Sequence, residues 1–138
     1  MEDKEIQGLI QECFESLERR TDLEFSYQWF STEKKLTKTE VMVTLAETSD
    51  GRHSGGKAGL STKTSFGTHW ICLFRKELRK MAENDYFEND LKKAVKNVCI
   101  HEVLHILDKI KNGKDTKTEK EIIRLSIYYM DNNLPLEI

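Results

Sequence analysis

The sequence predicts an α+β fold with an N-terminal helix, a small three-stranded and mostly antiparallel sheet, a buried central helix and a C-terminal helix. Apolar residues recur with helical spacing at the start, three short segments then alternate apolar and polar residues, and helical spacing returns in the second half. Of the 138 residues, 38% are hydrophobic, which suffices for one core. We therefore expect a single domain over residues 1–138.

The first predicted element is a helix from about Glu2 to Arg20. Its apolar positions follow i, i+3, i+4, i+7 spacing, which places them on one buried face. They are Ile6, Leu9, Ile10, Cys13, Phe14 and Leu17.

Three short strands are expected next, over Leu23–Trp29, Glu40–Glu47 and Thr68–Phe74, because aromatic or β-branched residues alternate there with other residues. The segment Ser49–Gly67, between the second and third strands, holds five of the seven glycines. Such a density predicts a flexible loop. It is either a long hairpin connection or a flap over a site.

The second half of the chain reads as helical. A short helix is expected over Glu77–Glu83, and Asn89 or Asp90 can cap a longer one that ends near Lys111. Gly113 suits the C-terminus of that helix.

A last helix is expected from about Thr118 to Met130, followed by a tail over residues 132–138 in which Pro135 prevents further helix. Its predicted buried face consists of Ile122, Ile123, Leu125, Tyr129 and Met130.

The charge and the cysteine content argue against several classes of function. Lys and Arg number 22 and Asp and Glu 24, a net charge of -2, so no nucleic-acid partner is expected. Three widely spaced cysteines predict neither a disulfide framework nor a cysteine zinc site. With no apolar signal core at the N-terminus and no long apolar run, we expect no membrane association and a cytoplasmic location.

The motif that carries chemistry is His101-Glu102-Val103-Leu104-His105, an HExxH sequence. On a helix, residues i and i+4 project from one face, so His101 and His105 can bind one Zn²⁺. Glu102 lies about 100° round the helix. It can act as general base on a metal-bound water whose pKa the ion lowers towards about 7.

The flanks of the motif favour a buried helix over a charged surface one. Ala94 and Val98 lie on the same side of the helix as the histidines, and most of the rest of the helix surface is apolar. The apolar positions are Val95, Ile100, Val103, Leu104, Ile106, Leu107 and Ile110. Buried histidines need partners, and a metal supplies one.

A catalytic zinc site needs a third protein ligand. Glu119 falls near the middle of the predicted buried face of the last helix, and Glu121 near its edge. Thr118 and Glu121 match a capping box, which leaves Glu119 for the metal. A competing frame with Thr116 as N-cap would make Glu119 the capping residue and Glu121 the ligand.

Other candidates remain open. His69 and His53 are rival third ligands, and either could instead stabilise an oxyanion, as could Tyr128 or Tyr129. Asp108 is too far along the helix to share the ion with His101. It is either a group that orients His105 or a neighbour by hydrogen bond, or a surface carboxylate.

Cys72 is better read as a strand residue than as a ligand. An HExxH motif with an upstream cysteine is typical of peptide deformylases, but the glycine-rich and Glu-Gly-Cys-Leu-Ser segments of that family are missing here.

With HExxH on a buried helix, a strand upstream and a glutamate on the following helix, the sequence resembles the zincin metallopeptidases of the gluzincin type. It is also similar to small metallopeptidases inferred in phages and mobile elements. The resemblance implies that His101, His105 and Glu119 bind Zn²⁺ and that Glu102 is the base. It also implies that an edge strand, here around Trp70–Phe74, aligns a peptide substrate antiparallel to itself.

The chain departs from larger relatives of this type in two ways. The interval from His105 to Glu119 is shorter than in large gluzincins. Asp108 and Lys111 stand where metzincins carry Gly and His, which excludes that subclass.

The leading expectation is therefore a minimal zinc-dependent peptidase that acts on a peptide or protein substrate. The alternative is a non-catalytic, metal-stabilised protein-binding module of a phage or mobile element. A SprT-like protease that works near DNA fits the net charge less well.

Overall fold

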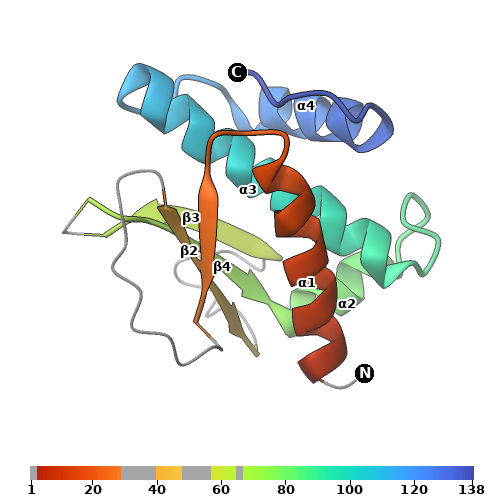
Figure 1. Ribbon diagram of the computed structural model, residues 1–138. Helices are drawn as coiled ribbons and strands as arrows, with labels where there is room; N and C mark the ends of the chain where they lie inside the picture. The colour runs from red at the N-terminus through yellow and green to blue at the C-terminus, as the bar shows by residue number, and fades with distance from the viewer. Residues whose placement is uncertain (1–2, 29–39, 48–56, 65–66) are drawn as a thin grey trace.

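A computed structural model describes residues 3–28, 40–47, 57–64 and 67–138 (Figure 1). The predicted α+β class is confirmed, because the described residues form helices and one mixed four-stranded sheet. The elements are α1 (Asp3–Glu18), β1 (Glu24–Tyr27), β2 (Glu40–Ala46), β3 (Gly59–Lys63), β4 (His69–Phe74), α2 (Arg75–Ala82), α3 (Leu91–Asn112) and α4 (Glu119–Asp131).

The predicted three-stranded, mostly antiparallel sheet is wrong in strand number and direction. The strand order is β1-β2-β4-β3, in which β1, β2 and β4 run parallel and β3 is antiparallel to β4. Alternation of apolar residues reports a strand but not the direction of its neighbour. The long connections from β1 to β2 and from β2 to β4 allow crossovers, which parallel pairing requires.

The additional strand, β3, lies inside the segment that the sequence assigned to a glycine-rich loop. Gly59–Lys63 pairs along His69–Leu73, and Thr64 and Thr68 close the hairpin between them. Gly67 has a φ of +84°, a backbone conformation in which a residue with a side chain would be strained. Residues 49–56 and 65–66 of the assigned loop, which include His53, lie outside the described residues, as does Trp29.

This topology also corrects the assignment of Trp70–Phe74 as an edge strand. β4 lies between β2 and β3, and among the described strands the two edges are β1 and β3. β3 is the edge strand that packs against α3. Apolar and polar residues alternate little in β3, so the sequence assigns β3 to a loop. Its neighbour β4 is then mistaken for the edge strand.

The hydrophobic core lies between one face of the sheet and the helices. Val41 and Val43 of β2 and Ile71 and Leu73 of β4 are fully buried on that face. The central helix is α3, which packs against α1, α2, α4 and β3 (Figure 1). One correction concerns Ile110, which the sequence placed among the apolar girth of α3 and which is half exposed.

The predicted ends of α3 are confirmed. The side chain of Asp90 accepts a hydrogen bond from the backbone N–H of Lys93, and Gly113 takes the left-handed conformation at the C-terminus with φ of 76°. The helix that carries the HExxH motif is therefore capped at both ends, in addition to being packed against its neighbours.

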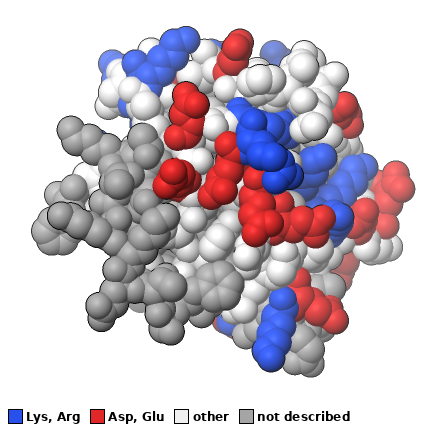
Figure 2. All heavy atoms as spheres, in the orientation of Figure 1, with Lys and Arg blue, Asp and Glu red and all other residues white. Residues whose placement is uncertain are grey.

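Lys, Arg, Asp and Glu side chains intermingle on the face of the molecule drawn in Figure 2. The described residues include an ion pair between Lys92 and Glu12, whose charged atoms are 2.9 Å apart. None of the helices in the described part of the chain combines the length and apolar character that crossing a membrane requires.

Candidate metal centre

The two histidines of the HExxH motif face the same point. Their Nε2 atoms are 3.2 Å apart, and both side chains are largely buried. Burial lowers the pKa of His101, the neighbouring His105 lowers it further, and Glu119 partly opposes the shift. Near neutral pH His101 is therefore held in the neutral form that binds metals.

Glu119 of α4 completes the group. One carboxylate oxygen lies 2.7 Å from Nε2 of His105 and the other 3.1 Å from Nε2 of His101. Glu119 is the first residue of α4, and the buried positions Ile122, Ser126 and Tyr129 follow it at helical spacing. The Glu119 side chain is itself 53% exposed, so the predicted place near the middle of the buried face is wrong, and Glu119 lies at the exposed start of that face. The predicted inclusion of Ile123 in that face is wrong, because Ile123 is 48% exposed.

His101, His105 and Glu119 form a group that could hold a metal ion. In a tetrahedral zinc site with bonds of about 2.0 Å, ligand atoms lie roughly 3.3 Å apart. The Nε2 atoms of the two histidines are 3.2 Å apart, close to that value, and one ligand atom from each of the three residues lies within 4.8 Å of the others. Two imidazole nitrogens and one carboxylate oxygen are also the donor set of catalytic zinc sites.

Glu102 lies beside this group but is not part of it. Its side chain is 5% exposed, and burial raises its pKa to about 7, while hydrogen bonding with the Ser61 hydroxyl opposes the rise. A carboxylate with this pKa can both accept and return a proton near neutral pH.

Gly59 makes room for Glu102 under the edge strand. A Cβ at Gly59 would lie 2.6 Å from Cγ1 of Val98 and 3.2 Å from Cγ and Oε2 of Glu102. Distances under 3 Å between carbon atoms do not occur without displacement, so β3 can approach α3 this closely only because residue 59 has no side chain.

Asp108 is fully buried, so it is not a surface carboxylate. It does not orient His105 either. It accepts hydrogen bonds from the Asn112 side chain (2.8 Å), the Thr116 hydroxyl (2.6 Å) and the backbone N–H groups of Thr116 (2.7 Å) and Lys117 (3.0 Å). Burial alone raises the pKa of Asp108, but these hydrogen bonds outweigh it and hold the pKa below its usual value.

The loop that Asp108 binds connects α3 to α4, so the hydrogen bonds of Asp108 fix the entry to the helix that carries Glu119. Asp115, from the same loop, lies beside His105 instead, with its carboxylate 3.6 Å from Nδ1. A carboxylate on the far nitrogen of a metal-binding histidine orients the ring.

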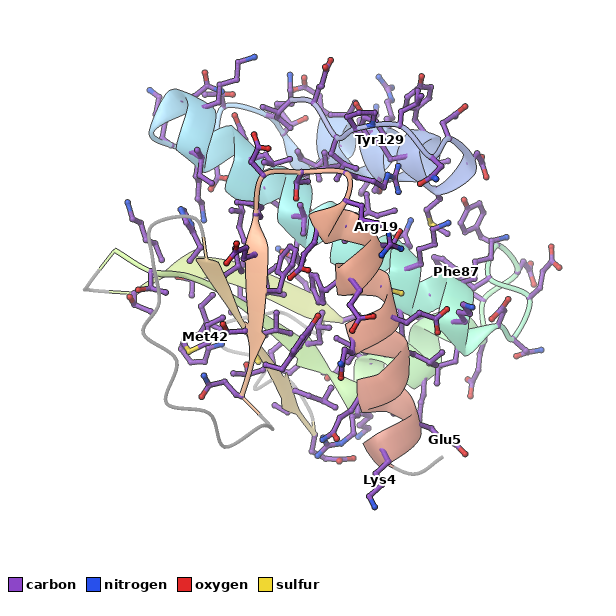
Figure 3. The ribbon with its side chains drawn as sticks, in the orientation of Figure 1. Lys4, Glu5, Arg19, Met42, Phe87 and Tyr129 are labelled. Atoms are coloured by element: carbon purple, nitrogen blue, oxygen red, sulfur yellow. The ribbon has the colours of Figure 1, made fainter. Side chains whose placement is uncertain are left out.

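The C-terminal end of α4 is held by Arg20. Its guanidinium donates hydrogen bonds to the backbone carbonyls of Tyr129, Asn132 and Leu134 at 2.9, 2.7 and 2.8 Å. Figure 3 labels Tyr129 on α4 and, at the C-terminal end of α1, Arg19, the neighbour of Arg20 in the sequence. The helix that carries Glu119 is thus tied to the rest of the molecule at both ends.

Two adjoining cavities open at the group formed by His101, His105 and Glu119. One, of about 190 Å³, is lined by the polar side chains of Ser61, Lys109 and Asp115. The other, of about 210 Å³, is lined by Met81, Val98 and Ile123. Both are lined as well by Lys57, Gly59, His101, Glu102 and Glu119.

The structure leaves the rival ligands outside the group. Glu121 forms the predicted capping box with Thr118. His69 is buried in β4 and lines neither cavity, and Cys72 is a half-buried strand residue. The hydroxyl of Tyr129 bonds to the backbone of Glu137, away from the metal group.

Sequence reasoning missed Lys57, Gly59, Ser61 and Asp115. The first three lie in or next to a strand that was read as loop, and only the small residues Gly59 and Ser61 hint at a close approach to a helix. Asp115 follows the helix cap at Gly113, and nothing in its sequence context separates it from an ordinary loop residue.

No protein-family model, curated protein or solved structure matches the chain.

Proposed function

We propose that the chain is a minimal zinc-dependent peptide-bond hydrolase of the gluzincin type. The observation that carries this proposal is the convergence of Nε2 of His101, Nε2 of His105 and the Glu119 carboxylate beside the buried Glu102. When bound, a zinc ion would polarise a carbonyl group and lower the pKa of a water molecule.

Each residue then has a distinct task. His101, His105 and Glu119 would hold the ion, and Asp115 would orient the ring of His105. Glu102 would take the proton of the attacking water and return it to the leaving amine.

The edge strand β3 is the better candidate for substrate alignment than Trp70–Phe74. It forms the antiparallel edge of the sheet, packs against α3, and contributes Gly59 and Ser61 to the lining of the cavities. A peptide paired with β3 would lie over His101 and Glu102, with one cavity on either side of the bond to be cut.

The test is hydrolysis of a mixed peptide library by the metal-loaded wild type and by Glu102→Gln, followed by mass spectrometry. The variant should keep its metal and lose hydrolysis by about 10²-fold or more. The matched control is Glu121→Gln, which alters an exposed glutamate of α4 and should cleave as the wild type does. Equal cleavage by Glu102→Gln would contradict the proposal.

A metal-stabilised binding module is the second candidate. The observation that favours it is the exposed apolar character of α4, where Ile123, Ile127 and Tyr128 are 48%, 37% and 49% exposed. On this hypothesis Glu102→Gln leaves the biological activity intact, whereas His105→Ala removes it.

A further inference from the structure

Lys57 is the lysine that lines both cavities at the metal group. It stands two residues before Gly59, where β3 begins, and it shares the lining of both cavities with His101, Glu102 and Glu119. Lys57 therefore lies where the two cavities meet, beside residues of the candidate metal site.

Both carboxylates that line the two cavities, Glu102 and Glu119, share that lining with Lys57. The second lysine of the polar cavity is Lys109, and its Nζ lies 3.8 Å from a carboxylate oxygen of Asp115. No ion pair joins Lys57 to a carboxylate in the described part of the chain.

Among the described residues, the other candidates for stabilising an oxyanion do not fit. Tyr128 and His69 line neither cavity, and the hydroxyl of Tyr129 bonds to the backbone of Glu137. His53 lies outside the described residues. Hydrolysis of a peptide bond nevertheless creates negative charge on the carbonyl oxygen, and a preformed donor at that point is a large part of catalysis.

We propose that the ammonium group of Lys57 stabilises the negative charge that develops on the substrate carbonyl oxygen, an inference that rests on the proposed peptidase function. As the bond from the attacking water to the carbonyl carbon forms, the π electron pair of the carbonyl moves onto its oxygen. Lys57 donates a hydrogen bond to that oxygen and keeps its proton, while Glu102 holds the proton that the water loses. When the C–N bond breaks, the electron pair returns and the proton on Glu102 passes to the amine.

The experiment compares Lys57→Met, which keeps the length of the side chain without its charge, with Lys57→Arg, which keeps the charge. The matched control is Lys76→Met, which changes an exposed lysine of α2. Each full-length protein is loaded with Co²⁺ and titrated with inorganic phosphate, whose binding next to the metal is followed by the visible absorption of the ion. Phosphate presents the negative oxygen that Lys57 would meet.

The dissociation constant for phosphate should rise roughly 10-fold or more in Lys57→Met and stay near the wild-type value in Lys57→Arg and Lys76→Met. The kcat/KM of Lys57→Met on peptides should fall by about 10²-fold or more.

Wild-type phosphate affinity in Lys57→Met, or an equal loss in Lys57→Met and Lys57→Arg, would overturn the role of Lys57. Neither result affects the proposed function, whose own test is Glu102→Gln. A wild-type protein that takes up no cobalt would overturn both.

Discussion

Gly59 on β3 and Glu102 on α3 are so close that a methyl group on Gly59 would lie 3.2 Å from Oε2 of the Glu102 carboxylate. The edge strand and the candidate base are therefore in contact, and the missing side chain at residue 59 is what permits it. Glu102 is buried beside this strand, and burial raises its pKa.

Gly59→Ala should displace β3 from α3. The added methyl group would stand 2.6 Å from Cγ1 of Val98, a short branched side chain that cannot swing away. We expect the free energy of unfolding to fall by about 1–3 kcal/mol, measured by urea denaturation. The control is Gly8→Ala in α1, where no atom lies within 4 Å and a gain of about 0.5–1 kcal/mol is expected. Equal stability of Gly59→Ala and wild type would contradict this account.

Asp108→Asn should destabilise the connection between α3 and α4 in a pH-dependent way. The hydrogen bonds of Asp108 hold its pKa in the folded state below the usual value. Its charged form therefore stabilises the fold above the unfolded pKa of about 3.9, and this contribution is lost as the pH falls further.

Urea denaturation at several pH values tests this. Above about pH 5 the variant should be less stable than wild type by about 2 kcal/mol, and the difference should shrink as the pH falls below about 4. A difference that does not change with pH would show that the charge of Asp108 is not what matters.

Arg20→Met should loosen the C-terminal end of α4. Arg20 is 7% exposed and donates to three backbone carbonyls, which its removal leaves without their donors. We expect a loss of about 2–4 kcal/mol in the free energy of unfolding. Arg19→Met changes the adjacent exposed residue and should stay within about 0.5 kcal/mol of wild type. Similar losses in the two variants would refute the role of Arg20.

Added Zn²⁺ should stabilise the folded chain, because the group of His101, His105 and Glu119 joins two helices only in the folded state. At a free concentration 100 times the dissociation constant, the gain is about 2.7 kcal/mol. The thermal unfolding midpoint should rise with zinc in wild type and in Glu121→Gln but not in His105→Ala. A rise in His105→Ala as large as in wild type would place the ion elsewhere.

The helices and the capping residues could be predicted from the sequence because their signals are local. Asp90 and Gly113 stand at the ends of an apolar helix, and the capping box of Thr118 and Glu121 is a fixed spacing. That local reasoning also left Glu119 for the metal group. Sheet topology could not be predicted, because strand direction depends on contacts between distant segments.

The walls of the candidate site were beyond the sequence for the same reason. Lys57, Gly59 and Ser61 come to line the cavities only because β3 packs on α3. The five glycines of the segment Ser49–Gly67 predicted a loop where the five-residue strand β3 lies. The sequence left Asp108 open between a supporting group and a surface carboxylate. Its partners are the Asn112 and Thr116 side chains and the backbone of the loop, and not His105. Hydrogen bonds to a loop backbone leave no pattern in the sequence.

The most direct test of the metal centre is elemental analysis of the purified chain. Wild type and Glu121→Ala should each carry close to one transition-metal ion per chain, and Glu119→Ala should lose it. Absence of metal from wild type, or an unchanged content in Glu119→Ala together with a loss in Glu121→Ala, would contradict the metal centre proposed for His101, His105 and Glu119.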